Sequence, residues 1–166
     1  MMIFAILLWC FIGVENCEFQ RPIPSDTLIT LQRTNCFFTC PDYMVTISAD
    51  GKVVFQGNAN VKVKGESEAF ISPEKVELLI KSFKKAKFFS LRNRYSLPED
   101  GCRIYDGDAS SATISIVLNG KSKSIDHYLG CHQKKGTAVR ALIELEGLID
   151  ELTNTARWID DEKHEK

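Results

Sequence analysis

The sequence has no excess of positive charge. Lys and Arg together number 21 and Asp and Glu number 22, so the formal net charge is −1. Proteins that bind nucleic acid need clustered Lys and Arg to neutralise phosphates. The balanced charge therefore argues against a nucleic-acid partner, and a hydrophobic share of 44% is ordinary for a globular protein.

Sequence signatures of catalysis are also missing. The chain has no Gly-x-Ser-x-Gly elbow, no phosphate-binding P-loop, no dinucleotide fingerprint and no His-Glu-x-x-His motif. The acidic residues Glu99, Asp100, Asp106 and Asp108 cluster, but the EF-hand pattern is absent, so we interpret them as solvated loop carboxylates. The sequence assigns no catalytic residue and no cofactor.

The apolar N-terminal run is too short to cross a membrane. It covers residues 3–14, which is 12 residues, whereas a spanning helix needs about 20. This length is typical of a signal-peptide core. We therefore expect a signal peptide over residues 1–19, no membrane span, and export to the periplasm or the extracellular space. No Lys or Arg precedes the run and no Ala-x-Ala site follows it, so a buried N-terminal strand or helix is the alternative.

Four of the six cysteines lie beyond this leader, namely Cys36, Cys40, Cys102 and Cys131. An even number of cysteines behind an export signal indicates disulfides, because exported proteins fold in an oxidising compartment. Four cysteines allow three pairings, which the sequence does not distinguish. We expect Cys36 to pair with Cys40, and Cys102 with Cys131.

Thiol exchange or soft-metal binding is the alternative use of these cysteines. A thioredoxin-like site places Cys-x-x-Cys at a helix N-terminus, which differs from Cys36-x-x-x-Cys40 in both spacing and context. Thiol and imidazole groups suit copper or zinc. The candidate ligands are Cys102, His127, Cys131 and His132. No closed four-ligand spacing is present, and we place His127 opposite Ala112 on the apolar face of a hairpin.

Two kinds of periodic pattern follow the leader. Alternating strand patterns occupy residues 28–33, 43–49, 53–55, 61–64 and the two arms of a hairpin that turns at Asn119-Gly120. Helical patterns begin at Ser72-Pro73 and near Thr137, and residues 92–111 show no period and are expected to form a long loop.

The expected helices each have one apolar stripe. The first is formed by Val76, Leu79, Ile80 and Phe83, and the second by Ala138, Leu142, Leu145, Ile149 and Leu152. The pattern predicts an α+β fold, with an antiparallel sheet built from two hairpin regions and two main helices packed on one face. We expect a single domain over residues 26–159 and a charged, disordered tail over residues 160–166.

Several short motifs occur together in one order. They are Cys36-Phe-Phe-Thr-Cys40-Pro-Asp-Tyr43, Asp50-Gly51-x-Val-x-Phe-x-Gly57, Ile71-Ser-Pro-Glu-Lys-Val76, Phe88-Phe89-Ser-Leu91, Asn119-Gly-Lys-x-Lys123 and Thr155-x-Arg-Trp-Ile159. In this combination the chain resembles the bacterial domain-of-unknown-function family 6438 over about residues 28–159. The resemblance implies an exported or envelope-associated single domain, and it implies no activity.

Two functions from different classes remain. The first is a non-catalytic envelope or periplasmic domain that binds a protein or a small ligand, is stapled by two disulfides, and is a monomer by default. The second is a thiol-redox or copper- or zinc-binding protein that uses its Cys and His residues. We prefer the first, because disulfides account for the cysteine pattern and no nucleophile–base pair is visible.

Overall fold

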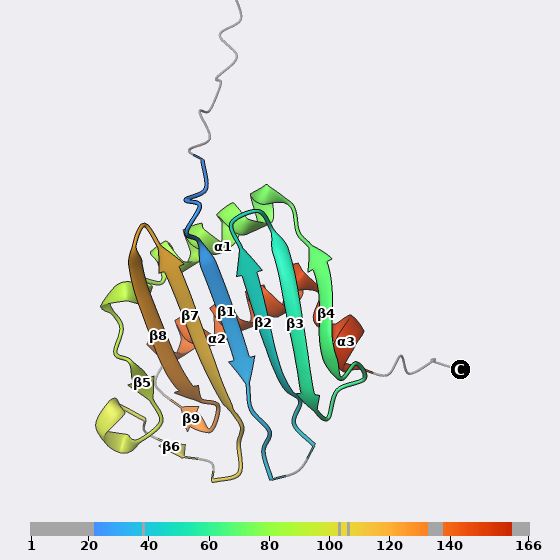
Figure 1. Ribbon diagram of the computed structural model, residues 1–166. Helices are drawn as coiled ribbons and strands as arrows, with labels where there is room; N and C mark the ends of the chain where they lie inside the picture. The colour runs from blue at the N-terminus through green and yellow to red at the C-terminus, as the bar shows by residue number, and fades with distance from the viewer. Residues whose placement is uncertain (1–21, 38, 103, 106, 133–137, 161–166) are drawn as a thin grey trace, which may run out of the picture.

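The computed structural model describes residues 22–37, 39–102, 104–105, 107–132 and 138–160. Its centre is a seven-stranded sheet, and Figure 1 shows the helices lying behind that sheet, on one face. The predicted α+β fold is confirmed. The elements in chain order are β1 (Leu28–Arg33), β2 (Asp42–Ser48), β3 (Lys52–Ala59), β4 (Gly65–Phe70), α1 (Pro73–Lys85), η1 (Phe88–Ser90), β5 (Arg94–Tyr95), η2 (Pro98–Asp100), β6 (Ile104–Tyr105), β7 (Ser111–Leu118), β8 (Lys121–Tyr128), β9 (Cys131–His132), α2 (Ala138–Thr153) and α3 (Ala156–Ile159).

The sheet joins the two hairpin regions through its first strand. The strand order is β4-β3-β2-β1-β7-β8-β5, so β1 pairs with β2 on one side and with β7 on the other. The pairs are antiparallel except for β5, which runs parallel to β8. A second, two-stranded sheet is formed by β6 and β9. The central position of β1 means that its inward side chains reach the middle of the helix layer.

The two tight turns use residues that tolerate positive φ. Asn119 and Gly120 have φ values of 52° and 71°, which suits the twist of the β7–β8 hairpin. Gly51 has a φ of 84°, and a Cβ there would lie 2.2 Å from the carbonyl oxygen of Ile71. This β2–β3 turn therefore needs glycine both for its backbone conformation and for its close approach to the start of α1.

The helices cover the inward face of the sheet with apolar side chains. The predicted α1 stripe is correct, since its four residues are the buried residues of that helix. In α2, Leu142, Leu145 and Ile149 are buried as predicted, but Ala138 and Leu152 are only half-buried. Val139 and Thr153, one position further on, are buried in their place, and the polar Glu146 is buried as well. These polar residues concealed the true stripe from a pattern based on apolar side chains.

The strand predicted at residues 61–64 is wrong. This segment is a connection, and the edge strand β4 follows it at Gly65–Phe70. The backbone N–H groups of Lys62 and Val63 donate to the carbonyl oxygens of Ile159 and Trp158, at 3.3 and 3.0 Å. The alternating apolar residues of the segment thus pack beside α3 instead of within the sheet. Residues 92–111, expected to be a loop, contain the short elements β5, η2 and β6.

Trp158 closes the core beside α3. It is buried, and its ring stacks on Phe55 of β3 at a centroid distance of 4.8 Å. The Arg157 guanidinium lies 3.9 Å from the centroid of the same indole ring. The C-terminal turn is therefore held against the sheet by aromatic packing.

Candidate functional site

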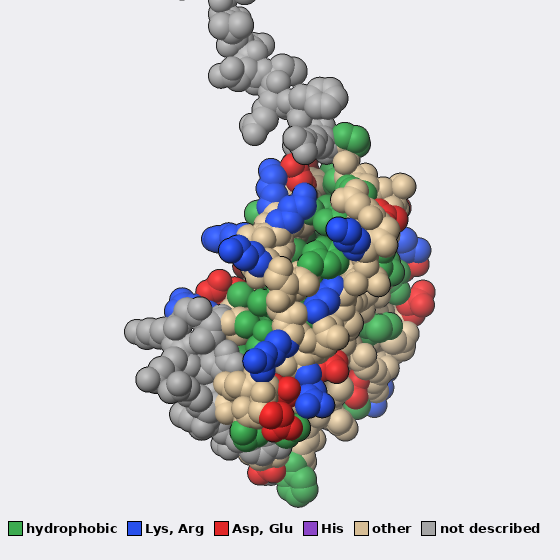
Figure 2. All heavy atoms as spheres, turned by 90° about the vertical axis from the view of Figure 1, so that its left-hand side faces the viewer, with side chains coloured by type: hydrophobic (Ala, Val, Ile, Leu, Met, Phe, Trp, Pro, Cys, Tyr) green, Lys and Arg blue, Asp and Glu red, His purple; other side chains and the backbone are tan. Residues whose placement is uncertain are grey.

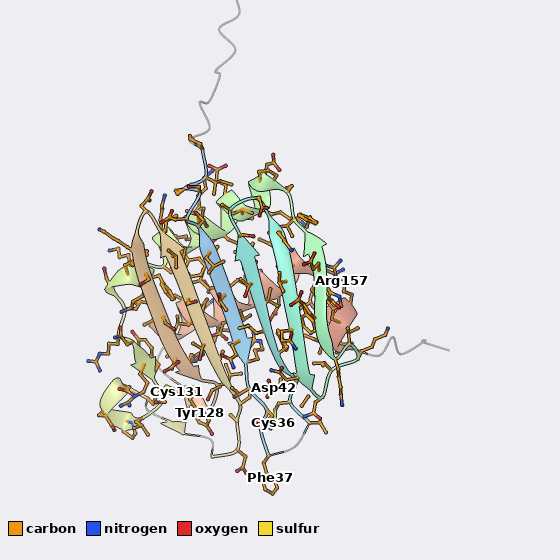
Figure 3. The ribbon with its side chains drawn as sticks, viewed as in Figure 1. Cys36, Phe37, Asp42, Tyr128, Cys131 and Arg157 are labelled. Carbon is orange, nitrogen blue, oxygen red and sulfur yellow. A yellow bond between two sulfur atoms is a disulfide. The ribbon has the colours of Figure 1, made fainter. Side chains whose placement is uncertain are left out.

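The four cysteines beyond the leader form two disulfides, Cys36–Cys40 and Cys102–Cys131. The first closes the connection between β1 and β2. The second joins the segment before β6 to β9, and both of its cysteines are buried. Figure 3 places Cys36 at the lower end of the sheet and Cys131 near the end of β8. Both pairs therefore staple long or irregular connections to the ends of strands.

Two of the four alternative metal ligands are used in a disulfide. Cys102 and Cys131 are bonded to each other, so neither offers a free thiolate. Within the described ranges, no group of three or more His, Cys, Asp and Glu side chains is arranged to hold a metal ion. The side chain of His132 lies outside the described part of the structure.

The clustered loop acids have separate surroundings. Asp100 accepts a hydrogen bond from Arg94 Nε at 2.8 Å and others from the backbone of Ser96 and Leu97. The Arg94 hydrogen bond holds the pKa of Asp100 below its usual value. Glu99 and Asp108 are exposed, and Asp106 lies outside the described residues. Asp100 thus organises its own turn.

The titratable residues that do meet are buried beneath α2. His127 of β8 pairs with Ala112 of β7, as predicted from the Asn119-Gly120 turn, and its side chain faces inward. Its Nδ1 is 2.8 Å from Glu146 Oε1, and the two side chains are 0% and 2% exposed. Because a carboxylate oxygen accepts, the imidazole Nδ1 is the donor of this bond. Among the described residues, Nε2 of His127 has no hydrogen-bond partner.

Arg33 extends this pair into a cluster. Its Nη1 is 3.5 Å from Glu146 Oε2, and its Nη2 is 2.9 Å from Asp150 Oδ2. The hydroxyl of Tyr43 donates to Asp150 Oδ1 at 2.8 Å, and that of Thr155 donates to the same oxygen at 3.0 Å. One guanidinium therefore joins two carboxylates of α2 to β1.

Burial and charge act together on the two β-strand members. Burial, and then the neighbouring Asp150 carboxylate, raise the pKa of Tyr43 far above its usual value. Burial alone would lower the pKa of Arg33, but Asp150, Tyr43 and Glu146 outweigh it and the pKa is raised. Tyr43 thus remains a hydrogen-bond donor and Arg33 remains a cation.

Sequence reasoning singled out only His127 of this cluster. A signal existed for Arg33, because strand alternation places it on the same face as Ile29 and Leu31. The partners Glu146 and Asp150 carry no comparable signal. The cluster links β1, β2, β8 and α2, and its His–Glu pair is sealed from solvent. Its geometry is that of a structural clamp.

Two exposed features of the described surface are a disulfide-closed loop and a groove. The first is the Cys36–Cys40 loop, where Phe37 is 82% exposed and points away from the sheet in Figure 3. Asn60 at the end of β3 donates to the carbonyl oxygen of Cys40 at 3.0 Å, so the loop is tied to the neighbouring hairpin. The disulfide and this side-chain hydrogen bond therefore constrain the ends of a loop that carries an exposed aromatic ring.

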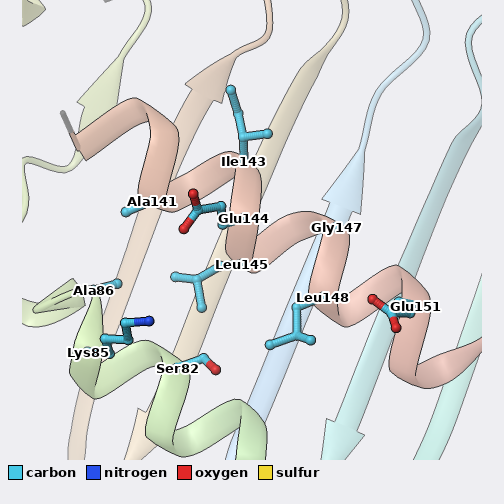
Figure 4. Close-up of a pocket in the computed structure, with 10 residues that line it drawn as sticks. All are labelled: Ser82, Lys85, Ala86, Ala141, Ile143, Glu144, Leu145, Gly147, Leu148 and Glu151. Atoms are coloured by element: carbon cyan, nitrogen blue, oxygen red, sulfur yellow. The ribbon is translucent and has the colours of Figure 1, made fainter. Parts of the chain in front are cut away.

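The second feature is a groove between α1 and α2, with a volume of about 620 Å³. Figure 4 shows Leu145 and Leu148 of α2 directed toward the side that faces α1. The lining residues are Ser82, Lys85, Ala86, Ala141, Ile143, Glu144, Leu145, Gly147, Leu148 and Glu151. The groove is mainly apolar, with a basic side chain on α1 and acidic ones on α2.

Charge is mixed on one face of the molecule. On the side that Figure 2 shows, Lys and Arg side chains are interspersed with Asp and Glu, and no broad basic patch is seen among the described residues. No helix in the described ranges is long and apolar enough to span a membrane.

Comparison with known proteins identifies the family, although the match ends before the Thr155-x-Arg-Trp-Ile159 motif. No curated protein matches the chain. The family described as Domain of unknown function (DUF6438) matches residues 27–153, which includes β1 to β9 and α2. The chain therefore belongs to this family.

Proposed function

We propose that the chain is an exported, non-catalytic domain that binds a protein partner through the Cys36–Cys40 loop. The observation that carries this proposal is the phenyl ring of Phe37, 82% exposed on a loop closed by a disulfide. The export signal expected over residues 1–19 and the two disulfides support an oxidising compartment as the site of action.

An aromatic ring on a constrained loop suits an interface. Aromatic residues are enriched among the few side chains that carry most of the binding energy. Burying a Phe side chain contributes about 1.5–3 kcal/mol. A loop that is already ordered before binding loses less conformational entropy when the partner arrives. The disulfide joins Cys36 to Cys40 and the Asn60 side chain holds the carbonyl oxygen of Cys40, so both ends of the loop are constrained before binding.

The burial of the His127–Glu146 pair supports a structural role for it. A general base must lie within hydrogen-bond reach of the proton that it abstracts. His127 is 0% exposed and its Nδ1 is occupied by Glu146. The pair is consequently better suited to holding β8 against α2 than to meeting a substrate.

Export and disulfide status can be tested by intact mass. The chain is expressed with its own leader in an exporting host and alkylated with and without prior reduction, under native and denaturing conditions. We expect the measured mass to be lower than that of the full-length reduced chain by the mass of the leader and of four hydrogen atoms. No alkylation is expected unless reductant is present. Alkylatable thiols, or a native mass that contains copper or zinc removable by chelation, would contradict the proposal in favour of the thiol or metal function.

The binding role can be tested by a photo-crosslinking amino acid at position 37, in the exporting host. Phe70 provides a matched control, because it is an exposed phenylalanine on the edge strand β4. We expect one discrete protein adduct from position 37 and none from position 70. The purified adduct partner should bind the wild-type protein at least tenfold more tightly than Phe37→Ala. Equal crosslinking at both positions, or equal binding of Phe37→Ala, would refute the role of the loop.

A further inference from the structure

The two disulfides differ in how far solvent reaches them. Cys102 and Cys131 are 6% and 1% exposed and belong to the hydrophobic core. Cys36 and Cys40 are half-buried, and Phe37 between them is 82% exposed. Thiol–disulfide exchange begins when an incoming thiolate reaches a disulfide sulfur, so its rate depends on access. The Cys36–Cys40 bridge is therefore the more accessible of the two to a thiol in solution.

The fold also resists the opening of the two bridges unequally. Cys36–Cys40 has a sequence separation of 4, and Cys102–Cys131 has one of 29. In the chain-entropy model, a bridge that closes a longer loop stabilises the folded chain more. Because this coupling is reciprocal, folding favours the oxidised form of the longer bridge more strongly. Exposure and loop length therefore both indicate that the Cys36–Cys40 bridge opens at a lower concentration of reductant.

Opening the short bridge leaves the main sheet in place. The bridge lies in the connection between β1 and β2, beyond the ladder in which every residue of β1 pairs with β2. The Asn60 side chain donates to the carbonyl oxygen of Cys40, and this hydrogen bond does not involve the sulfur. Figure 3 shows Cys36 and Phe37 below the strands, at the end of the sheet. Reduction thus releases the cross-link around Phe37 without removing a contact of the buried core.

We propose that the Cys36–Cys40 disulfide is a redox switch that a dithiol protein opens by thiol–disulfide exchange. One thiolate of the dithiol attacks a sulfur of the bridge, the S–S bond breaks, and the other cysteine leaves as a thiolate. The second thiol of the dithiol then displaces the mixed disulfide. The chain thereby gains two electrons and two protons, and the dithiol is oxidised to its own disulfide.

The chain is the substrate of this exchange and not its catalyst. A catalytic Cys-x-x-Cys pair lies at a helix N-terminus, whereas Cys36 and Cys40 lie between two strands. The disulfide constrains the loop around Phe37 in the oxidised form, so reduction should weaken the binding of a partner to this loop. This effect on binding rests on the function proposed above, but the exchange itself does not.

The exchange is tested with the oxidised protein purified from an exporting host. The protein is equilibrated with mixtures of reduced and oxidised dithiothreitol, quenched with acid, alkylated, and analysed by peptide mass. We expect Cys36 and Cys40 to be half alkylated at a reduced-to-oxidised ratio at least tenfold below that required for Cys102 and Cys131. Equal ratios, the opposite order, or no alkylation of Cys36 and Cys40 while the circular dichroism of the fold persists would overturn the proposal.

Chymotrypsin, which cleaves after aromatic residues, tests the response of the loop. The variant Cys36→Ser/Cys40→Ser reproduces the open loop, and Phe70 on β4 is an internal control because it is also exposed. We expect cleavage between residues 36 and 40 to be at least tenfold faster in the variant than in the oxidised wild type. Cleavage at Phe70 should be unchanged, and the variant should retain one cooperative melting transition. Equal cleavage of the loop in both proteins would overturn the switch.

Binding measurements separate the switch from the function on which its effect rests. A partner identified by crosslinking from position 37 should bind Cys36→Ser/Cys40→Ser at least tenfold more weakly than the wild type. Wild-type affinity in that variant, together with weaker binding by Phe37→Ala, would overturn the switch and leave the binding role of the loop intact. Equal binding by Phe37→Ala would refute the binding role instead, and the alkylation experiment would still decide the exchange.

Discussion

Removal of the Arg33 guanidinium is the strongest test of the buried cluster. Arg33→Met keeps most of the side-chain volume and removes the only cation that contacts both Glu146 and Asp150 in the described structure. The Arg33 side chain is 19% exposed and that of Glu146 is 2% exposed. In the variant, the Glu146 and Asp150 carboxylates would therefore lose the guanidinium at a place where water cannot fully replace it.

The magnitude follows from this burial. Removing one member of a buried ion pair costs about 3–5 kcal/mol, because the remaining charge is left uncompensated. Such a loss is a large part of the roughly 5–15 kcal/mol that stabilises a typical domain. For a domain of this size it corresponds to a fall in melting temperature of roughly 10–20 °C. Asp150 keeps the hydrogen bond from the Tyr43 hydroxyl and Glu146 keeps the one from His127, so the loss is that of the positive charge that compensates both carboxylates.

Urea unfolding followed by circular dichroism measures this change in the oxidised protein. Lys81→Met is the control, because it removes a cation from the exposed i,i+4 pair with Glu77 on α1. Exposed helix pairs of this kind contribute about 0.3–0.5 kcal/mol. If Arg33→Met lowers the free energy of unfolding by no more than the control does, the cluster is not a structural clamp and our reasoning about its burial is wrong.

Three further changes test other parts of the fold. Tyr43→Phe should make the free energy of unfolding less dependent on pH in the alkaline range. The pKa of Tyr43 is raised in the folded state, so its stabilising contribution is complete below the unfolded pKa of about 10 and is lost as the pH rises above that value. A variant as alkali-sensitive as the wild type in equilibrium unfolding would count against this. Asp100→Asn should reduce the loss of stability on acidification. The pKa of Asp100 is lowered in the folded state, so the carboxylate stabilises the fold above its unfolded pKa of about 4, and this stabilisation is lost as the pH falls through the folded pKa. Thermal melts from pH 2 to pH 6 measure this loss. If the melting temperature of the variant falls with pH as steeply as that of the wild type, the contact of Asp100 with Arg94 is not the source of the acid sensitivity. Replacing both Cys102 and Cys131 by Ser removes a disulfide that joins residues with a sequence separation of 29. The chain-entropy relation then predicts that the free energy of unfolding falls by about 3.5 kcal/mol. Guanidinium unfolding should show this loss, and a stability equal to that of the wild type would mean that the bridge is dispensable.

The sequence by itself determined the elements whose signals are local. Such signals are the alternation in β1, β2, β3 and β7, the Asn119-Gly120 turn and the apolar stripe of α1. Each depends on residues a few positions apart, and all of these are present in the structure. The α+β fold class follows from these hairpins and helices. Even the inward position of Arg33 is contained in the alternation of β1, although its charge made that position easy to overlook.

Only the tertiary structure decided which residues meet. Arg33 and Asp150 are 117 positions apart, and no local period relates a strand residue to one turn of a distant helix. The segment at 61–64 has a strand-like alternation, but its backbone hydrogen bonds go to α3. The cysteine pairing and the buried clamp likewise arise from the packing of elements on each other. Local periodicity specifies the elements, whereas distant partners are selected by the burial and charge that exist only once those elements are packed.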